Sequence, residues 1–329
     1  MGHVQRRQFL IAAGALLAAP LRAGAQQPAK VWRIGHLELG SRQMTSDRHA
    51  AFLQGMRERG YAEGKQFVFE ARYADGNADR LDGFAAELVR LKADVILTIG
   101  NPASHAAQRA TPAIPIVVVG TADPVRDGFA ESLARPGGNI TGLSSGSGEI
   151  VQKWVEFLIT IIPKSSRVAA LLNPANSAHS HMLLSVQTAL RKTGRQVLPI
   201  SARSPEDIER GFAAMARERA DAVILLPDSA FSQHRHQVAG LALKHRLPTI
   251  AQASVFAEAG VLLAYGFEIN DSLRSAATFV DKILKGAKPG ELPFEQPTRY
   301  YLVINRKTAK ALGLTIPQEL LLRADKVID

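Results

Sequence analysis

Polar side chains occur in the loops that follow apolar, strand-like runs of the sequence. They belong to short turns marked by glycine or proline, such as Gly100-Asn101-Pro102 and Asn173-Pro174-Ala175-Asn176, and a helix-like stretch follows each turn. The free backbone N–H groups at a helix start, with the positive end of the helix dipole, bind anions without a basic side chain. The turns therefore predict a site for a carboxylate-bearing small molecule. Its candidate residues are Asn101, Asp123, Asn176 and Asp228.

Some of these residues also have a purely local interpretation. Asn101, Asp123 and Asn176 fit the N-cap position of a helix, and Pro102 and Pro124 fit the first helical position. Capping and ligand binding are compatible, so the sequence leaves both roles open.

Two carboxylates could meet a ligand that also carries an ammonium group, because a buried cation needs a partner. Asp228 is the better candidate, since it directly follows an apolar strand in a loop without a proline-led cap, and Asp123 is the second. Tyr265, at the end of the apolar run 261–265, could stack on a planar ligand. The alternative for Tyr265 is ordinary packing at a strand end.

Residue patterns of known catalytic and metal sites are missing from the sequence. There is no cysteine, and no glycine-rich nucleotide fingerprint, phosphate-binding loop or Gly-x-Ser-x-Gly elbow follows a strand. His179 and His181, like His234 and His236, are two residues apart at expected helix starts, where their side chains point to different faces. We therefore expect no catalytic residue, no metal site and no cofactor.

The elements that would position these loops alternate between strands and helices, the pattern of parallel βαβ units. Two series are predicted. The first has strands 31–37, 67–73, 95–99 and 116–119, with helices 47–59, 78–91 and 103–110 between them. The second has strands 167–172, 196–200, 222–226, 249–251 and 261–265, with helices 177–192, 205–218 and 231–244.

The two series resemble each other as a diverged internal repeat would. Residues 93–97 read Ala-Asp-Val-Ile-Leu and residues 220–225 read Ala-Asp-Ala-Val-Ile-Leu. In each half a loop, a helix and a proline that enters the next strand follow, at Pro115 and Pro248. Chance similarity of generic α/β sequences is the alternative. Two parallel-sheet lobes have a cleft beyond the carboxyl ends of their strands, where ligands bind.

The segment between the two series predicts where the chain passes from one lobe to the other. Residues 135–144 are rich in turn formers and end in a short strand, and helix 271–284 and segment 297–305 follow the second series. We expect residues 31–144 and 270–298 in lobe 1, and residues 145–269 and 299–329 in lobe 2.

The N-terminus predicts a signal peptide of residues 1–25. Arg6 and Arg7 precede an apolar run at 9–21, and Ala23-Gly24-Ala25 matches the small residues of a cleavage site. That run of 13 residues is shorter than the roughly 20 that a membrane-spanning helix needs. Residues 5–10 are similar to a twin-arginine motif, so we expect twin-arginine export to the periplasm. A buried N-terminal helix is the alternative.

Composition and charge favour a globular protein with a solvated surface. With 46% hydrophobic residues, the 329-residue chain can form two α/β domains of usual size. The net charge is +10, and removal of residues 1–25 leaves 37 basic against 30 acidic residues. These charges alternate along helices, as in Arg57-Glu58-Arg59, instead of forming a basic stripe. We therefore expect no nucleic-acid binding. We also expect the protein to be a monomer.

Several longer motifs of the chain resemble one family of proteins. They include Gly60-Tyr61-Ala62-Glu63-Gly64, the segment 88–96, Ala122-Asp123-Pro124-Val125, the segment 132–142 and the ending from residue 302 to 314. The chain is similar over its whole length after residue 25 to ABC-transporter substrate-binding proteins of the tryptophan/tyrosine type. The resemblance implies the type I periplasmic-binding-protein fold, an α/β fold of two Rossmann-like lobes with parallel sheets joined by a three-strand hinge.

The resemblance also implies a function and a binding site. The expected function is the periplasmic solute-binding component of an ABC importer, which delivers a small carboxylate-bearing solute to an inner-membrane permease. The expected solute is an amino acid, with aromatic amino acids among the candidates. The cleft residues that it implies are Asn101, Asp123, Ser144, Asn173, Asn176, Asp228 and Tyr265. Asn101 stands where many relatives have Thr, and Thr121 where Gly is frequent, so the ligand stays open.

Three other functions are compatible with a two-lobed α/β chain. A periplasmic ligand sensor that feeds a sensor kinase or chemoreceptor would have the same sequence features. A LacI-type transcriptional regulator would need an N-terminal DNA-binding motif where the signal peptide stands. An α/β enzyme would need the catalytic motifs that are missing.

Overall fold

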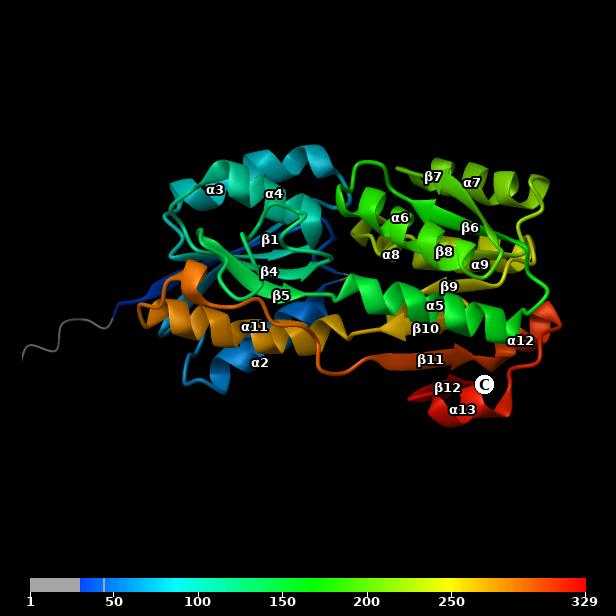
Figure 1. Cartoon of the computed structure of the whole chain (residues 1–329). Coiled ribbons are helices and arrows are strands. Elements are labelled where there is room, and N and C mark those ends of the chain that lie inside the picture. Colours follow the sequence, from blue (N-terminus) through cyan, green and yellow to red (C-terminus); the bar gives the residue numbers. More distant parts are fainter. Residues whose placement is uncertain (1–29, 44) are drawn as a thin grey trace, which may run out of the picture. The chain divides into compact units, whose positions relative to one another are not determined.

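The computed structural model describes residues 30–43 and 45–329. The predicted signal peptide, residues 1–25, lies outside this part of the chain. Within the described residues, no helix is both long enough and apolar enough to cross a membrane. The elements form two separate β-sheets with helices packed on them (Figure 1).

The first sheet has five parallel strands in the order β2-β1-β3-β4-β5. The strands are β1 (Trp32–Glu38), β2 (Phe67–Tyr73), β3 (Val95–Ile99), β4 (Ile116–Thr121) and β5 (Ile140–Ser144). The helical elements of this lobe are α2 (Ser46–Arg57), η1 (Ala78–Arg80), α3 (Leu81–Arg90), α4 (Gly100–Ala110), α11 (Ile269–Leu284) and η2 (Pro289–Glu291). We call this sheet with its helices the first lobe.

Both faces of the first sheet are covered by helices, which explains the continuous apolar runs of its central strands. Val95 and Leu97 of β3 pack with α2 and α11, whereas Ile96 packs on the opposite face with α3 and α4. Val117 and Val118 of β4 divide between the faces in the same way. Alternation along a strand thus supplies two separate cores from one sequence run.

The second sheet has seven strands in the order β12-β11-β10-β9-β8-β6-β7. They are β6 (Arg167–Leu172), β7 (Gln196–Ser201), β8 (Ala222–Leu225), β9 (Thr249–Ala251), β10 (Leu263–Gly266), β11 (Tyr301–Asn305) and β12 (Lys326–Ile328). The strands from β6 to β10 pair in parallel, and β11 runs antiparallel to β10. This sheet with its helices is the second lobe.

Eight helices of the described chain belong to the second lobe. They are α5 (Ser147–Ile161), α6 (Ala178–Arg191), α7 (Pro205–Arg217), α8 (Ser229–Gln233), α9 (Arg235–Lys244), α10 (Ser254–Ala259), α12 (Arg306–Leu312) and α13 (Gln318–Arg323). Helices α5 and α6 pack on one face of the sheet, and α7 and α9 pack on the other.

The strand order agrees with the predicted internal repeat. In each lobe the second strand along the chain lies at one edge, followed by the first, third, fourth and fifth strands. The antiparallel β11 and its neighbour β12 extend only the second sheet. The prediction of two α/β lobes built on parallel sheets is therefore confirmed.

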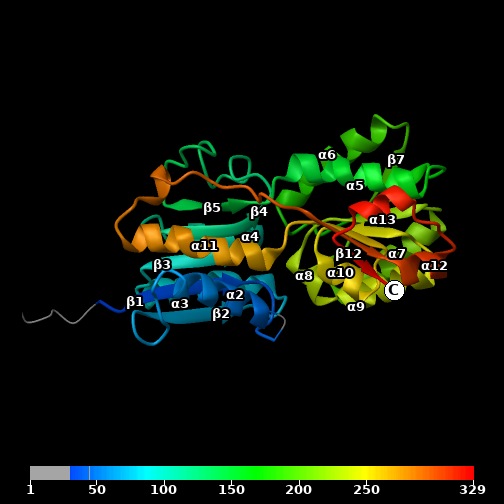
Figure 2. The same ribbon diagram turned by 90° about the horizontal axis from the view of Figure 1, so that it is seen from below.

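The chain passes between the lobes at three places. It leaves β5 for α5, leaves β10 for α11, and passes from η2 to β11 (Figure 2). The third segment pairs with the first, because Leu143 and Glu295 form a β-bridge and Ser144 donates its N–H to the Glu295 carbonyl (2.9 Å). Three connecting segments are what the predicted hinge requires.

Two predicted helices differ from the observed ones. The predicted helix 231–244 is divided at His234, whose backbone (φ −103°, ψ 24°) ends α8 and begins α9. The predicted helix 78–91 begins instead as the 3-10 turn η1, because the Asn77 side chain accepts the N–H of Asp79 before α3 starts.

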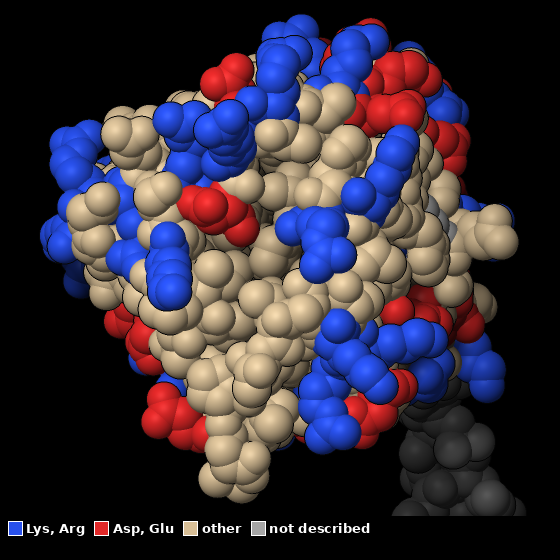
Figure 3. Space-filling model, turned by 90° about the vertical axis from the view of Figure 1, so that its right-hand side faces the viewer, with Lys and Arg blue, Asp and Glu red and all other residues tan. Residues whose placement is uncertain are grey.

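Charged side chains are dispersed on the face of the molecule shown in Figure 3. Lys and Arg stand there in several separate groups, with Asp and Glu between them and uncharged residues around them. On this face the charges are distributed as the sequence predicted.

Candidate functional site

A cavity of about 120 Å³ is lined by residues of both lobes. Its walls come from the segments that follow β3, β4 and β5 in the first lobe, and β6, β8, β9 and β10 in the second. These are the carboxyl ends of the strands, where open α/β sheets bind ligands. The polar side chains among its lining residues are Arg48, Asn101, Ser145, Asn176, Asp228, Ser229, Ser232 and Gln252.

The wall of the first lobe contains one arginine, which is held by a buried acid. Glu38, at the end of β1, has no exposed surface, and its Oε1 forms an ion pair with Nη1 of Arg48 on α2. The His36 Nε2 lies 3.4 Å from Glu38 Oε2. Burial raises the pKa of Glu38, but Arg48 and His36 outweigh it, and the pKa lies below its ordinary value. Glu38 is therefore an anion that fixes the Arg48 side chain.

Asn101 lies at the start of α4 and has an unused hydrogen-bond donor. Gly100 takes up a left-handed conformation (φ +74°) that turns the chain from β3 into the helix. Asn101 is 3% exposed and lines the cavity, and its Nδ2 has no hydrogen-bond partner among the residues that the structure describes. A buried donor without a partner costs about 1–3 kcal/mol, so a ligand acceptor at this place would remove a penalty.

The wall of the second lobe contains a buried carboxylate surrounded by amides. Asp228 accepts hydrogen bonds from Nδ2 of Asn176 (2.9 Å) and Asn173 (3.4 Å), and from the N–H of Ala230 (2.8 Å). The last bond caps α8. The Asp228 side chain is 1% exposed, and in the described part of the chain no lysine or arginine pairs with it. Its negative charge is thus hydrogen-bonded and lacks a cation.

His179 lies beside Asp228 without supplying that cation. The N–H of Asn173 donates to its Nδ1 (2.7 Å), so the proton is on Nε2, which donates to the Pro227 carbonyl (3.0 Å). Burial lowers the pKa of His179, and this effect exceeds the opposing effects of Asp228 and the backbone partners. The ring is neutral at pH 7 and 4.0 Å from Asp228 Oδ2.

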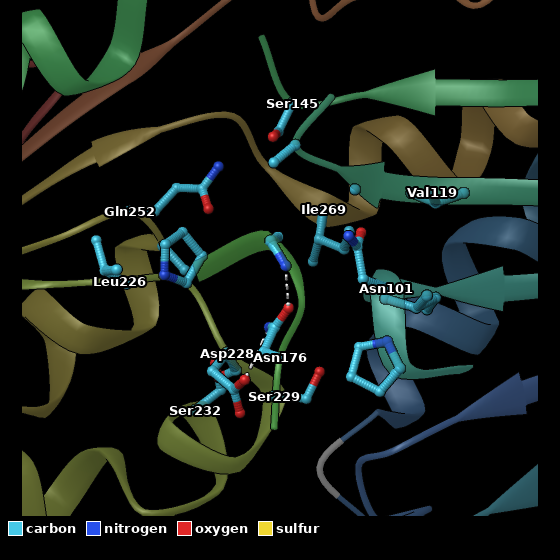
Figure 4. A pocket seen from close by; sticks show the side chains of 18 of the residues that line it. Asn101, Val119, Ser145, Asn176, Leu226, Asp228, Ser229, Ser232, Gln252 and Ile269 are labelled. Carbon is cyan, nitrogen blue, oxygen red and sulfur yellow. Dashed lines mark hydrogen bonds between the residues drawn. The ribbon is translucent and has the colours of Figure 1, made fainter. Parts of the chain in front are cut away.

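Apolar side chains complete the cavity between these polar walls. Phe267 and Ile269 come from the segment that enters α11, and Met182, Leu226 and Phe256 come from the second lobe. In the close-up, Asn101 and Ile269 lie on one side of the cavity, and Asn176 and Asp228 lie on the other (Figure 4). The arrangement suits a molecule with charged groups at one end and an apolar side chain.

Three of the seven predicted site residues line this cavity, namely Asn101, Asn176 and Asp228. Asn173 does not line the cavity itself, but its side-chain amide donates a hydrogen bond to Asp228, which does. Ser144 is buried, and its Oγ has no hydrogen-bond partner within residues 30–43 and 45–329; the next residue, Ser145, lines the cavity instead.

The other two predicted residues lie elsewhere. Asp123 caps its own turn, since its Oδ1 accepts the N–H groups of Val125 and Arg126 (both 3.2 Å). Tyr265 packs edge-on against Phe157 and stacks on Tyr300, with ring centroids 5.0 and 5.8 Å apart. In this arrangement Asp123 has the local capping role, and Tyr265 has a packing role.

Metal chemistry has no support from the side-chain geometry of the described residues. Among them, no group of three or more His, Cys, Asp or Glu side chains is placed to hold a metal ion.

Comparison with known proteins identifies the family of the chain. Residues 42–328 match the model of the family described as ABC transporter substrate binding protein. The chain belongs to this family. Its expected family, its two-lobed fold and its role as a solute-binding component of an ABC transporter are thus confirmed.

The chain is similar to a curated protein and to a solved structure from two bacteria. A tyrosine-binding protein of Clostridioides difficile (strain R20291) is 23% identical over 263 residues, which are 80% of this chain and 75% of that protein. The structure of a conserved domain protein from Vibrio cholerae O1 biovar eltor is 27% identical, with a TM-score of 0.85 over 91% of this chain and all of that one.

A third similar structure contains a bound amino acid. It is an ABC domain from Streptococcus pneumoniae in complex with L-Trp, 24% identical, with a TM-score of 0.85 over 91% of this chain and all of that one. At 24% identity this structural similarity shows that the two chains share a fold and nothing about what this chain binds.

Three residues at the cavity of this substrate-binding protein were not predicted from the sequence. Arg48 and Gln252 line the cavity, and Glu38 positions Arg48. Glu38 carried a usable signal, because a carboxylate at the end of the apolar strand-like run Ile34-Gly35-His36-Leu37 requires a buried partner. Arg48 carried none, since an arginine in an amphipathic helix is ordinarily exposed.

Proposed function

We propose that this substrate-binding protein binds an α-amino acid in the cavity between its lobes. One observation carries the proposal: Asp228 is a buried carboxylate that lines the cavity, and no lysine or arginine of residues 30–43 and 45–329 pairs with it. A buried charge is stable only when it is paired, and the ammonium group of an amino acid would supply the missing charge.

The side chain of the proposed ligand is apolar and aromatic. Phe256, Phe267, Ile269 and Met182 offer apolar contacts in the cavity. One relative is named for tyrosine binding, and a similar structure holds L-Trp. These observations together favour L-tyrosine or L-tryptophan over aliphatic acids or aromatic degradation products.

Binding would act through closure of the lobes. A ligand that contacts residues of both lobes stabilises the arrangement in which the two walls face each other. The proposed lobes are residues 31–144 with 270–298, and residues 145–269 with 299–329. The closed protein, as a monomer without catalytic activity, would deliver the ligand to an inner-membrane permease. Residues 1–25 would direct export to the periplasm by the twin-arginine route.

The proposal is tested by ligand screening of the protein without residues 1–25. Thermal-shift measurements with the protein amino acids and with simple carboxylates, followed by calorimetric titration, would identify the ligand. We expect L-tyrosine or L-tryptophan at 100 times Kd to stabilise the protein by about 2.7 kcal/mol. If simple carboxylates stabilise the protein and amino acids do not, the proposed role of Asp228 is wrong.

A substitution tests the role of Asp228 directly. Asp228→Asn keeps the shape and most hydrogen bonds but removes the charge, so we expect about 10- to 100-fold weaker binding of the amino acid. Asp82→Asn is the matched control, because Asp82 is exposed on α3 and pairs with the exposed Arg109. Equal affinity of the two variants would contradict an ammonium site at Asp228.

A further inference from the structure

Neutralising the buried Glu38 does not require that its partner, Arg48, also line the cavity. Glu38 could be neutralised by any buried cation, yet its partner begins on α2 and extends to the cavity wall, where the Arg48 side chain keeps 21% of its surface exposed. The guanidinium group has five N–H donors, and the ion pair with Glu38 occupies Nη1. Donors of Arg48 thus remain for a molecule in the cavity.

A second donor lies on the same wall and points independently to an acceptor. The buried Nδ2 of Asn101 has no hydrogen-bond partner in the described part of the chain, and Asn101 is at the start of the 11-residue helix α4. The positive end of the helix dipole adds to the attraction for an anion. Arg48, Asn101 and the start of α4 therefore form a wall of donors in the first lobe.

We propose that Arg48, positioned by Glu38, binds the carboxylate of the ligand and so fixes its orientation. This inference rests on the proposed function. The carboxylate lies against the first lobe, at Arg48 and Asn101, and the ammonium group lies against Asp228 of the second lobe. An amino acid then connects the two lobes through its two charges, and a molecule that lacks either charge contacts only one lobe electrostatically.

Charge balance supports this orientation. Arg48 at the first wall and the buried Glu38 together have no net charge, whereas the partners of Asp228 at the second wall are uncharged among the described residues. The carboxylate of a ligand would meet hydrogen-bond donors at the first wall and a like charge at Asp228. The reverse orientation would place the ammonium group against donors, which is unfavourable.

The test compares ligands that differ by one group in proteins that differ by one side chain. L-tyrosine and L-tryptophan are each compared with their carboxamides, which keep the ammonium group but lack the carboxylate. We expect Arg48→Gln to weaken binding of the amino acids about 10- to 100-fold and binding of the carboxamides less than about threefold. Arg57→Gln is the matched control, because Arg57 is exposed on the same helix.

Glu38 is tested as a positioning residue. We expect Glu38→Gln to weaken binding of the amino acids more than that of the carboxamides, since it frees the Arg48 side chain without removing it. Arg48→Gln leaves Glu38 buried without its cation and could unfold the protein. The double variant Glu38→Gln/Arg48→Gln removes both charges, and we expect it to fold and to show the same selective loss.

Two results would overturn the inference. One is unchanged amino-acid affinity in the double variant relative to Arg57→Gln, and the other is an equal loss for amino acids and carboxamides, which indicates a purely structural role. Failure of the proposed function is separate, because the unmodified protein would then bind no amino acid. In that case 3-(4-hydroxyphenyl)propionate is the probe: binding that Arg48→Gln abolishes supports the carboxylate site, and no binding by the unmodified protein overturns it.

Discussion

At the scale of single residues, the two buried carboxylates of the cavity region are stabilised in different ways. Glu38 has a permanent cation in Arg48, whereas Asp228 has two side-chain amides, a backbone N–H and a neutral histidine. Hydrogen bonds stabilise a buried anion but do not cancel its charge. The difference explains why one carboxylate can be structural while the other is suited to a ligand cation.

His179 makes the stability of this region dependent on pH. Burial lowers its pKa from the ordinary value of 6.5, so between that value and its folded-state pKa the unfolded chain binds more protons. The free energy of unfolding should therefore fall as the pH falls from about 7 through this window. His179→Gln should flatten the slope and, because it disturbs a buried hydrogen-bonded group, cost about 1–3 kcal/mol at pH 7.

Denaturant unfolding at several pH values between 5 and 8 measures this effect. His236→Gln is the control, since His236 is exposed. A residual slope is expected in the variant, because burial also lowers the pKa of His49. A slope as steep in His179→Gln as in the unmodified protein would exclude His179 as its source.

At the scale of elements, buried strands were the most predictable part of the fold. The ranges predicted for strands 95–99 and 167–172 agree with β3 and β6, whose apolar runs contain no glycine or proline. The range 67–73 agrees with β2, although Glu70 and Arg72 interrupt its apolar residues. Helix α5 was not predicted, although Ile150 to Ile161 is apolar at helical spacing. The preceding glycine- and serine-rich turn made that region appear to be a connection.

The binding site was predictable where it depends on topology and not where it depends on tertiary contacts. Asn101 and Asp228 lie in the turns just after β3 (Val95–Ile99) and β8 (Ala222–Leu225), so their place at a sheet edge could be predicted from the sequence. Tyr265 also ends a strand, but its ring lies against Phe157 and Tyr300, which come from segments distant in sequence. Side-chain direction at a strand end depends on such partners, and a single sequence does not contain them.

Close packing of α2 against α11 requires the glycine in α2. A Cβ on Gly55 would overlap the backbone carbonyl of Arg274 and would come within 2.8 Å of the Ala277 Cβ. Gly55→Ala should therefore destabilise the protein by about 1–3 kcal/mol, because the two helices must separate. It should also weaken ligand binding, since α2 carries Arg48.

A second helical glycine is a matched control for that prediction. A Cβ on Gly83 in α3 would meet nothing within 4 Å. Gly83→Ala should stabilise the protein by roughly 0.5–1 kcal/mol through helix propensity alone. Thermal unfolding of both variants measures the difference, and stabilisation of both would show that the α2–α11 contact is not tight.

At the scale of the whole described chain, the three connecting segments meet in one small cluster. Tyr300, on the third segment, stacks on Tyr265 at the second, and its Oη donates to the Ser145 carbonyl on the first (3.4 Å). Gly146 follows Ser145 with a left-handed backbone (φ +62°). Tyr300 therefore joins all three segments, and Gly146 lies beside its hydroxyl group.

Substitution of Gly146 should change ligand affinity without touching the cavity wall. A Cβ at this position would come within 2.5 Å of the Tyr300 Oη, so the arrangement of the lobes in this structure would be disfavoured. Gly194→Ala has a similar backbone cost (φ +73°) but meets nothing within 4 Å, which isolates the effect of the clash. We expect Gly146→Ala to bind the amino acid about 3- to 10-fold more weakly than Gly194→Ala, because each 1.4 kcal/mol by which the arrangement of the lobes in this structure is destabilised lowers the affinity about tenfold.

Tyr300→Phe removes the clashing oxygen and should restore most of the affinity in the double variant, as measured by calorimetric titration. If Gly146→Ala and Gly194→Ala bind equally tightly, lobe closure does not depend on this contact.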